Sequence, residues 1–571
     1  MRFSKLFGKP TKNAVNNATA TSHKLLIQGG FIRPLSAGRY TFLPLGLKVA
    51  RKIEEVIRQE VEKTGAQELI VPTLHPLELW QQANRDKKFG SAMMKVKDRN
   101  QAEFTLGATA EVIMLDLVKQ FNVTYRDLPI NIYQFSQKFR DEARPTGGLL
   151  RTREFVMKDG YSFHTNEEDL KVTYKQYWEA YDRIAKKLDL KVIVVESDNG
   201  AIGGSSSHEF MVEADVGEDT VVRCDHCDYS ANLERAEFIR TDVNTKEAIK
   251  PMEIVYQPEW VKTMEDNIKH YGKSKEYYLK NVVYKDVDGT IIIAVIRGDL
   301  SVNKTKLSRV YQAKGELEPA TGEDLLSIGT KPGWVHCWGH KAVYVGDLSL
   351  KTVHNFIGGQ KEKETDTINV NYERDFKCSL FGDIAESREG DLCGKCMTGK
   401  LHHLKAVEFG NIFNIGYTYS EPMDGSFVDT DGSLKKLWMG SYGIGIGRAM
   451  AIIVEKHHDE KGIIWPETIA PYQVHLIGLD LFEEQIKTKA EHLYQTLCQK
   501  GIDVIYDDRE DVSAGAKFAD ADLVGASYRL VISKRSIENG GIELKKRSEK
   551  DSRIITADSF TKQLDTFFAL K

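Results

Sequence analysis

A tight turn between two alternating segments determines the local fold of residues 130–164. INIYQFSQKFRDE alternates polar and apolar side chains, as a strand does, and RTREFVMKDGYSFH alternates in the same way. Pro-Thr-Gly-Gly at 145–148 separates them, and glycine and proline are typical of tight turns. The pattern predicts a long antiparallel hairpin with the two glycines at its tip.

Four arginines flank the tip of this hairpin: Arg140, Arg144, Arg151 and Arg153. A guanidinium group presents a planar fork of N–H donors that matches the oxygens of carboxylates and phosphates. An isolated pair of arginines would favour a salt-bridged hairpin, because acidic residues lie in the same stretch. Four arginines around a Gly-Gly tip instead favour a site for a polyanion.

Length and composition exclude several classes of protein. A chain of 571 residues should hold roughly three or four domains. No apolar run approaches the ~20 residues of a membrane span, and the first residues, MRFSKLFGKPTKN, lack the apolar core of a signal peptide. A net charge of −4 argues against an indiscriminate nucleic-acid coat, though not against a local basic groove. We therefore expect a cytoplasmic protein with no membrane partner.

Two further segments carry recognisable patterns. PLGLKVARKIEEVIRQEVEKTG, at residues 44–65, predicts the clearest helix, because apolar residues recur at every fourth position, and AQELIVPTL predicts a short strand after it. Later, GSYGIGIGR places Gly443, Gly445 and Gly447 at alternate positions before Arg448. This spacing is not the dinucleotide fingerprint G-x-G-x-x-G, but it would let a ligand approach the backbone closely.

The rest of the chain alternates between strands and helices. HHLKAVEFGNIFNIG, at residues 402–416, predicts a pair of strands, and LWMGSYGIGIGRAMAIIVEKHHDE predicts a strand, a glycine turn and a helix. From about Pro471 onward, strand and helix patterns alternate regularly. Such alternation predicts a small sheet flanked by helices.

Three of these segments stand in the order of the motifs that define class II aminoacyl-tRNA synthetases. The helix and strand that end near Pro72 resemble the first motif. The segment from Gly443 to Arg448 resembles the third motif, GxGxG…R. The chain has neither a P-loop nor the HIGH and KMSKS signatures of class I enzymes. The second motif, fRxE…(H/R)xxxF, resembles Phe139, Arg140, Glu142, Arg151 and Phe155.

Longer segments resemble the bacterial-type prolyl-tRNA synthetases over essentially the whole length, among them SHKLLIQGGFIRPLSAGRYTFLPLGLKVARKI, FRDEARP and NGAIGGSSSHEFMVEAD. The resemblance implies an α+β protein whose antiparallel-sheet catalytic domain occupies residues 1–222 and 406–470. It also implies an inserted α/β editing-type domain at 223–405 and a C-terminal α/β anticodon-binding domain at 471–571.

The activity implied by the resemblance is the ATP-dependent attachment of L-proline to tRNA(Pro) through a prolyl-adenylate, with release of pyrophosphate and AMP. Positioning and electrostatics should dominate both steps, because both are charge problems at an α-phosphate. Magnesium ions would bridge the phosphates of ATP. The first motif packs across a two-fold axis in this class, so a homodimer is expected.

The resemblance also implies the residues that bind ATP. Arg140 would hold the α-phosphate and the proline carboxylate, and Arg448 would lie against the γ-phosphate. Glu142 would accept from the adenine amino group or position a nucleophile. The implied catalytic residues are Arg140, Glu142 and Arg448. The implied ATP-binding residues are Arg140, Glu142, Arg151, Arg153, Phe155, Gly445 and Arg448.

A proline pocket needs an acid and a hydroxyl for the secondary ammonium, beside a small apolar wall. GATAE resembles the family's Thr-x-Glu element, and GGSSSHEF would line the ring. A packed polar role in the core remains open for His208. The implied proline-binding residues are Thr109, Glu111, Arg140, Gly204, Ser206, His208, Gly440 and Ser441.

The inserted segment resembles the domain that hydrolyses Ala-tRNA(Pro) formed in error. A pocket for proline excludes alanine only weakly, because each missing methylene changes the discrimination by only ~10–200-fold. A separate site that hydrolyses the wrong product would supply the remaining accuracy. The residues implied for this editing site are Lys280, Asn303 and Gly333. The chain departs from the family pattern at Cys337, where the family has proline, and at Asp366, where it has histidine.

Two Cys-x-x-Cys pairs lie at the edges of this segment: Cys224, Cys227, Cys393 and Cys396. In a cytoplasmic protein such pairs suggest zinc before disulfides. Four thiolates at this spacing would hold a structural zinc ion if the ends of the insertion meet. Reduced thiols without metal are the alternative.

The C-terminal segment DDREDVSAGAKFADADLVG resembles the part of the family that contacts the proline anticodon. Arginine and lysine commonly bind the edges of guanine bases, and Arg509 and Lys517 are the candidates. A charged loop on a solvated helix is the alternative for both residues.

Two other functions stay open from the sequence. A non-catalytic relative that binds tRNA would tend to lose the ATP arginines or the anticodon domain, and this chain keeps both. A sister class II ligase for threonine or histidine is the second alternative. Threonine-specific enzymes usually supply zinc ligands from the catalytic core, whereas the Cys pairs here lie outside it.

Overall fold

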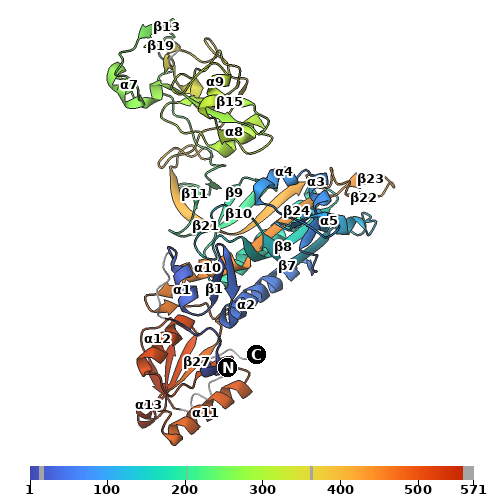
Figure 1. The fold of residues 1–571 in the computed structure, drawn as a ribbon, viewed down its shortest axis with the longest axis vertical. Coiled ribbons are helices and arrows are strands. Elements are labelled where there is room, and N and C mark those ends of the chain that lie inside the picture. The colour runs from blue at the N-terminus through green and yellow to red at the C-terminus, as the bar shows by residue number, and fades with distance from the viewer. Residues whose placement is uncertain (12–17, 201, 360–363, 557–571) are drawn as a thin grey trace. The chain divides into compact units, whose positions relative to one another are not determined.

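The computed structural model describes residues 1–11, 18–200, 202–359 and 364–556 (Figure 1). The chain divides into two compact units. Unit 1 comprises Met1–Ile193, Asn199–Glu218 and Lys405–Lys571, and unit 2 comprises Val194–Asp198 and Asp219–Leu404. Residues 557–571 of the predicted anticodon-binding domain lie outside the described residues. The sequence-based domain boundaries stay a prediction beside this division.

A mostly antiparallel sheet forms the centre of unit 1, with β10 and β24 on either side of β21. The order continues from β24 through β8 and β7 to β3, and in this part of the sheet β3 and β7 pair in parallel whereas the other pairs are antiparallel. The strands are β3 (Gln67–Glu68), β7 (Ile130–Phe139), β8 (Glu154–His164), β10 (Ser206–Glu213), β21 (Leu401–Gly416) and β24 (Trp438–Gly445).

The predicted arginine hairpin is present as β7 and β8, which pair from Ile130↔Phe163 to Phe139↔Glu154. Gly147 and Gly148 in the connecting turn have φ angles of 61° and 67°. L-residues with a side chain rarely adopt such angles, which explains why glycines occupy the tip.

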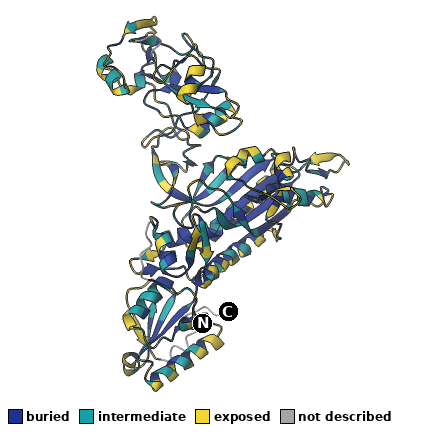
Figure 2. Cartoon of the chain, in the orientation of Figure 1, coloured by how far each residue is buried: buried dark blue, intermediate teal, exposed yellow. Residues whose placement is uncertain are grey.

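Helix α6 (Glu167–Lys187) packs against β8 and β24 of this sheet. The Tyr177 ring stacks on Tyr442 of β24 at a centroid distance of 3.6 Å. Lys158 is fully buried beneath the helix, where its Nζ donates to the Tyr181 hydroxyl at 2.9 Å and to the Tyr442 carbonyl at 3.0 Å. Figure 2 shows the central strands as the most buried part of unit 1.

The predicted long helix is α2 (Pro44–Val61), which packs against α6 and against α10 (Ile446–Lys456). Its apolar positions, such as Val49, Ile53 and Ile57, are buried, as the spacing predicts.

The predicted strand pair at 402–416 was wrong, because the segment is one long strand, β21. Gly410, near the middle of this strand, packs closely against its neighbours. A Cβ atom there would lie 3.0 Å from the Gly443 carbonyl oxygen and 3.1 Å from the Tyr181 ring. The register with β10 shifts at this glycine, so the strand bends without breaking.

The C-terminal part of unit 1 has the predicted alternation of strands and helices. Parallel strands lie in the order β28-β27-β29, and β30 and β31 continue the sheet in antiparallel fashion. Its elements are β27 (Val474–Gly478), α11 (Glu484–Gln499), β28 (Val504–Asp507), α12 (Ala514–Val524), β29 (Tyr528–Ile532), α13 (Lys534–Glu538), β30 (Ile542–Lys546) and β31 (Arg553–Ile555).

Unit 2 has a five-stranded sheet in the order β16-β14-β15-β17-β20 and a smaller sheet, β13-β19-β18. All seven residues of β15, IIIAVIR, are buried, as expected for a central strand with both faces covered. The elements are β13 (Glu253–Tyr256), β14 (Leu279–Lys285), β15 (Ile291–Arg297), α8 (Lys304–Tyr311), β16 (Glu318–Pro319), α9 (Gly322–Ser327), β17 (Val343–Asp347), β18 (Phe356–Gly358), β19 (Thr365–Val370) and β20 (Leu380–Gly382).

Among the described residues, no helix is both long enough and apolar enough to span a bilayer.

Candidate active site

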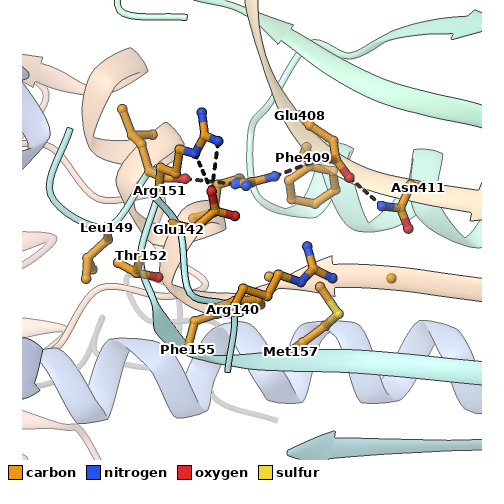
Figure 3. Close-up of a pocket in the computed structure, with 14 residues that line it drawn as sticks. Arg140, Glu142, Leu149, Arg151, Thr152, Phe155, Met157, Glu408, Phe409 and Asn411 are labelled. Atoms are coloured by element: carbon orange, nitrogen blue, oxygen red, sulfur yellow. Dashed lines mark hydrogen bonds and ion pairs between the residues drawn. The ribbon is translucent and has the colours of Figure 1, made fainter. Parts of the chain in front are cut away.

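A pocket in unit 1 lies between the arginine hairpin and the strands β21 and β24 (Figure 3). The hairpin contributes Arg140, Glu142 and Phe155, and the start of α10 contributes Arg448. The structure therefore brings the second and third sequence motifs together in one cavity. The other lining residues are Leu149, Leu150, Arg151, Thr152, Met157, Glu408, Phe409, Asn411, Gly443 and Gly445.

Arg140 is held from two sides at the end of β7. Its Nε donates to the carbonyl oxygen of Ala108 at 3.2 Å, and its guanidinium carbon lies 5.4 Å from the centre of the Phe155 ring. Burial lowers the pKa of Arg140, and the positive charge of Arg448 lowers it further. Two guanidinium groups sharing one cavity create a strong preference for an anion between them.

Arg151 binds one oxygen of the Glu142 carboxylate through two of its nitrogens. Its Nε and Nη2 donate to Oε2 of Glu142 at 3.0 and 2.8 Å, and its Nη1 donates to Glu218 at 3.0 Å. The Nε of Arg153 donates to the carbonyl oxygen of Glu142 at 2.9 Å. The salt-bridged hairpin and the anion site are thus not exclusive alternatives, since the same arginines pair with acids at the edge of the cavity.

Arg448 pairs with an acid that the sequence patterns did not identify. Its Nη1 donates to Oε2 of Glu408 at 2.9 Å, and its Nε donates to the Leu150 carbonyl at 2.9 Å. The amide of Asn411 donates to the other oxygen of Glu408 at 2.5 Å. Glu408 and Asn411 lie on β21, in the segment mistaken for a strand pair. No motif pattern marked them, and only the strand pairing reveals their place.

The glycines of β24 make room for these side chains. A Cβ atom on Gly443 would lie 2.7 Å from Oδ1 of Asn411, closer than real Cβ atoms approach. Gly445 forms the N-terminal boundary of α10. Gly443 thus lets the Asn411 side chain approach the backbone, and the approach of a ligand to these glycines stays a prediction.

A second, fully buried polar group lies at the start of α5 (Glu111–Lys119). Thr109 Oγ1 donates to Oε2 of Glu111 at 2.6 Å, and Ser441 Oγ donates to Oε1 at 3.0 Å. Burial raises the pKa of Glu111 above its usual value, although these two hydroxyls oppose that shift. Three of the residues expected for a proline pocket therefore meet.

The group continues through residues that the sequence did not single out. The Tyr161 hydroxyl accepts from the backbone N–H of Ala110 at 2.9 Å and donates to Oδ2 of Asp159 at 2.8 Å. The Nζ of Lys138, which is also buried, lies 2.9 Å from Oδ1 of Asp159. This chain of contacts fixes the backbone that carries Thr109 and Glu111.

Three expected proline-pocket residues belong to the opposite face of the sheet. Ser206 and Gly440 pair with the same residue of β21 from its two sides, so they share one face of the sheet. This face lies beneath α6, where a Cβ atom on Gly440 would lie 2.4 Å from the Tyr442 hydroxyl. His208 lies beside α6, where its Nδ1 is 2.7 Å from the Tyr174 hydroxyl. Because strand residues alternate between faces, Ser441 points away from this side.

The neighbouring residue Ser207 instead shares the face of Ser441, through the pairings Ser207↔Phe413 and Phe413↔Ser441. Its Oγ donates to Oδ1 of Asn199 at 2.6 Å. Gly204 is exposed, with a φ angle of 118°. The roles of Gly204, Ser206 and His208 around a proline ring stay predictions.

The structure places the expected editing residues of unit 2 in two locations. Lys280 Nζ donates to the Leu300 carbonyl at 3.2 Å, and Asn303 forms the N-cap of α8. Gly333 lines a pocket on the other side of the sheet, together with Leu279 and Asp366. Leu279 precedes Lys280 in β14, so the two side chains face opposite ways.

The two atypical positions of unit 2 are buried. Oδ2 of Asp366 accepts from Nε2 of Gln257 at 2.9 Å and from the Tyr271 hydroxyl at 2.8 Å, and burial raises its pKa. Cys337 is 2% exposed within the apolar core beside β15. The editing roles of Lys280, Asn303 and Gly333 stay predictions.

The candidate anticodon residues both have internal partners. Nη2 of Arg509 donates to Asp507 at 2.6 Å and to Asp520 at 2.9 Å. Lys517 is 2% exposed, and its Nζ donates to the Gly478 carbonyl at 2.6 Å. Neither matches the alternative of a freely solvated side chain, and their contact with a tRNA stays a prediction.

Two family models match the chain. The model described as the class II core domain of tRNA synthetases (G, H, P, S and T) matches residues 94–457, and an anticodon binding domain matches residues 468–566. The first contains the whole pocket of Figure 3, and the second contains the C-terminal sheet.

Curated relatives of similar length carry the name proline–tRNA ligase. The chain is 45% identical to the one from Sulfurihydrogenibium sp., over 96% of both chains. It is 43% identical to the one from Persephonella marina, over 99% of this chain and 100% of the relative. The relative from Thermotoga maritima is 41% identical, over 100% of this chain and 98% of its own length.

A solved structure shares the fold. The prolyl-tRNA synthetase of Cryptosporidium parvum, crystallised with halofuginone and AMPPNP, superposes with a TM-score of 0.57 at 14% identity. The match covers 96% of this chain and 76% of that one.

Proposed function

The chain belongs to the proline–tRNA ligases of the class II synthetase family, and from this we propose a division of labour among its residues. The observation that carries the proposal is the meeting of two sites along β24. Gly443 and Gly445 line the arginine pocket, and Ser441 contacts the buried Glu111. A polyanion and a small ammonium compound would thus lie side by side.

In the first step, a carboxylate oxygen of proline attacks the α-phosphorus of ATP and pyrophosphate leaves. Arg140 binds the α-phosphate and the proline carboxylate, which would otherwise repel each other. Arg448 and Arg151 bind the outer phosphates, and Phe155 stacks on the adenine. Such positioning and charge neutralisation account for most of the catalysis in phosphoryl chemistry.

Arg151 and Arg448 exchange partners when ATP binds. In the protein alone their guanidiniums are neutralised by Glu142 and Glu408. ATP replaces those contacts with phosphate oxygens, so the two acids become available for the adenine amino group and for metal ions. Arg153 stays attached to the Glu142 backbone and supports the turn.

The residues present fit a magnesium site for the phosphates of ATP. A carboxylate and an amide oxygen are ligands that Mg²⁺ prefers, usually with water and phosphate oxygens as the others. Glu408 and Asn411 supply such oxygens beside Arg448, and we propose that they hold Mg²⁺. The ion would neutralise phosphate charge, while the arginines orient the chain of phosphates.

The proline pocket is built around Glu111. Its carboxylate would accept two N–H bonds from the secondary ammonium of proline, with Thr109 and Ser441 fixing its orientation. The ring would pack against the apolar side of the pocket, where Phe413 and Tyr161 are buried. An acid buried in this way binds cations strongly because it has lost its own hydration.

In the second step, a ribose hydroxyl of the terminal adenosine of tRNA(Pro) attacks the carbonyl carbon of prolyl-adenylate, and AMP leaves. The C-terminal domain binds the anticodon. Lys280 and Asn303 take part in hydrolysing mischarged Ala-tRNA(Pro), which would act as the second sieve against alanine. This work takes place in the cytoplasm, where tRNA charging supplies translation.

A homodimer is part of the proposal. Phe42, Pro44 and Leu47 line a groove beside α2, the helix of the first motif, and Leu47 is 42% exposed. Exposed apolar side chains along a helix are typical of surfaces that bind another chain. A second copy of this chain is the partner expected in this class.

Amino-acid-dependent exchange of pyrophosphate into ATP tests the function. We expect exchange with proline to exceed exchange with alanine, threonine or histidine. Exchange with threonine or histidine instead would support a sister ligase. No exchange with any amino acid, with binding of tRNA(Pro) retained, would support a non-catalytic relative.

A further inference from the structure

The four cysteines of the Cys-x-x-Cys pairs form one compact cluster in unit 2. Cys224 is the last residue of β11 (Asp219–Cys224), Cys227 follows it, and Cys393 and Cys396 precede β21. All four Sγ atoms lie within 4.8 Å of one another. Cys224 and Cys393 are buried, whereas Cys227 and Cys396 are partly exposed. The ends of the inserted segment therefore meet, as a shared ligand set requires.

The sulfur–sulfur distances match a tetrahedral metal site. Sγ of Cys224 lies 3.7 Å from Sγ of Cys396, and Sγ of Cys227 lies 3.9 Å from Sγ of Cys393. A disulfide would need about 2.05 Å. Four thiolates bound to zinc at about 2.3 Å lie about 3.8 Å apart in a regular tetrahedron. We propose that these four cysteines bind one structural zinc ion.

Backbone N–H groups point at the sulfurs from both turns. His226 donates to Sγ of Cys224 at 3.4 Å, and Lys395 donates to Sγ of Cys393 at 3.4 Å. Gly399 donates to Sγ of Cys396 at 3.2 Å. Such outer contacts spread the negative charge of metal-bound thiolates and fix their direction. The donors are arranged as an anionic sulfur cluster needs.

The two turns approach more closely than a side chain would permit. A Cβ atom on Gly399 would lie 2.4 Å from Sγ of Cys224, so the glycine makes room for the sulfur of the other pair. The backbone N–H of Asp225 donates to the Lys400 carbonyl at 3.0 Å. The pairs are thus held face to face by main-chain contacts as well as by their sulfurs.

The ion would close the base of the inserted segment, because Cys227 and Cys393 are 166 positions apart. Residues 236–240 come soon after the first Cys pair in the chain, and they lie against the second Cys pair. Phe238 forms a β-bridge with Cys393, and the backbone N–H of Gly394 donates to the Glu237 carbonyl at 3.1 Å. The zinc would thereby order the segment that contains Phe238.

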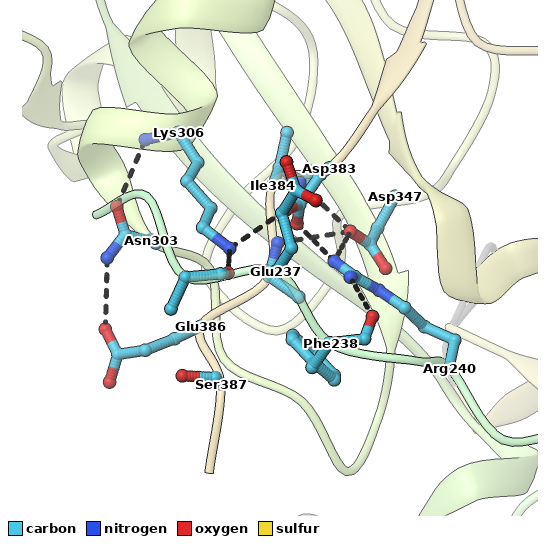
Figure 4. Close-up of polar contacts among 12 residues, drawn as sticks. Glu237, Phe238, Arg240, Asn303, Lys306, Asp347, Asp383, Ile384, Glu386 and Ser387 are labelled. Atoms are coloured by element: carbon cyan, nitrogen blue, oxygen red, sulfur yellow. Dashed lines mark hydrogen bonds and ion pairs between the residues drawn. The ribbon is translucent and has the colours of Figure 1, made fainter. Parts of the chain in front are cut away.

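A buried charge network begins at this segment (Figure 4). The Arg240 guanidinium lies 3.9 Å from the Phe238 ring centre and donates to Asp347 at 3.1 Å and to Asp383. Nζ of Lys306, on α8, donates to the same Asp383 at 3.0 Å.

Asn303 caps the helix that carries Lys306, since its side chain accepts from the Lys306 N–H at 3.1 Å. A zinc site at the base would therefore support α8 and Asn303 through Phe238, Arg240 and Asp383. The connection between the zinc site and editing rests on the proposed function, because it assumes the editing role of Asn303. The zinc content itself does not depend on it.

Metal analysis of the full-length protein, purified without chelators, tests the inference. We expect one zinc ion per chain. Cys227→Ser and Cys396→Ser should each remove it, while Cys498→Ser, which changes an exposed cysteine elsewhere in the chain, should retain it. Iron in place of zinc, or zinc retained in both ligand variants, would overturn the inference.

A second measurement does not depend on how the variants fold. The unaltered protein is alkylated before and after extraction of zinc with a strong chelator. We expect four thiols to become reactive in step with zinc release, and mass spectrometry should identify them as the four cluster cysteines. Cluster thiols that react fully before extraction, or that are recovered as disulfides, would also overturn the inference.

Proline-dependent pyrophosphate exchange separates this inference from the proposed function. We expect it to persist after zinc extraction, because every residue of the ATP pocket belongs to unit 1. Hydrolysis of mischarged Ala-tRNA(Pro) should fall in parallel with zinc. If the intact protein contains zinc but shows no exchange, the proposed function fails and the zinc site stands.

Discussion

Ser441 donates a hydrogen bond to Oε1 of Glu111 at 3.0 Å, although 330 positions separate the two residues in the sequence. Thr109 donates to the other carboxylate oxygen at 2.6 Å. A buried carboxylate with both oxygens engaged has a fixed orientation before any ligand arrives. Preorganisation of this kind reduces the cost of binding proline.

Glu111→Gln should weaken proline binding without affecting ATP. The variant keeps the shape of the side chain but removes the charge that pairs with the ammonium. Loss of a buried charge partner costs about 2–5 kcal/mol, so the KM for proline should rise by ~30-fold or more. Pyrophosphate exchange at varied proline checks this, with Glu78→Gln, an exposed residue, as the control. An unchanged KM would remove Glu111 from the proline pocket.

The affinity for proline should depend on pH through the same carboxyl. Burial raises the pKa of Glu111, so the empty pocket holds it protonated to a higher pH than usual. Proline keeps its ammonium proton in this range and pairs only with the ionised carboxylate. The KM for proline should therefore fall as pH rises towards that raised pKa and level off above it. Glu111→Gln should abolish the slope, and a slope that persists in the variant would assign it to another group.

Arg140→Ala should stop adenylate formation in a protein that still folds. Arg140 lines the pocket, and its guanidinium carbon lies 5.4 Å from the centre of the Phe155 ring. Removing a preorganised donor to developing charge costs about 10²–10³-fold in rate. Arg144→Ala is a matched control, because Arg144 lies on the same hairpin but is exposed and outside the pocket. Equal effects of both changes on pyrophosphate exchange would contradict the assignment.

Glu408→Gln should increase the magnesium requirement. Glutamine can still accept a hydrogen bond from Arg448, so the arginine keeps a partner while the metal loses a charged ligand. Changes around a metal site commonly cost 10–100-fold in metal affinity or activity, and we expect a shift of about that size in the half-saturating Mg²⁺ concentration. Titration of exchange with Mg²⁺ measures it, and Glu421→Gln, an exposed acid beyond the strand, serves as the control. A normal Mg²⁺ curve would place the ion elsewhere.

Glu408 is a site residue that could not be predicted from the sequence alone. The arginine hairpin, the long helix and the C-terminal alternation follow from local periodicity and turn residues, and all three are present. Glu408 and Asn411 carry no local signal of function. They reach the pocket only because β21 pairs with β24, which contributes Gly443 and precedes Arg448. Such long-range pairings are set by packing rather than by local propensity.

Ser206 and His208 show a second limit of prediction from sequence, which is that the face of a strand residue depends on the register. The segment GGSSSHEF was predicted to line the proline ring, but alternate residues of a strand face opposite sides of the sheet. The register places Ser207 on the face of Ser441, and places His208 beside α6. Without the register, a sequence shows that a strand is present but not which face each residue takes.

The buried Lys158 should make the stability of unit 1 depend on pH. Burial lowers the pKa of Lys158 to about 7, whereas an unfolded lysine titrates near 10.5. Between these values the unfolded chain binds more protons at this position, so the free energy of unfolding should rise with pH, by at most ~1.4 kcal/mol per unit from this one group. The contribution should be lowest below pH 7, where the folded state must bury a charged ammonium.

Lys158→Met keeps the length of the side chain and removes the titration. We expect the difference in thermal midpoint between the variant and the unaltered protein to favour the variant most at pH 7 and to shrink towards pH 9.5. Lys171→Met changes an exposed lysine on α6 and should show no such trend. Because other titrating groups affect both proteins equally, the difference isolates Lys158. A difference that stays constant across this range would mean that Lys158 is neutral throughout or is solvated despite its burial.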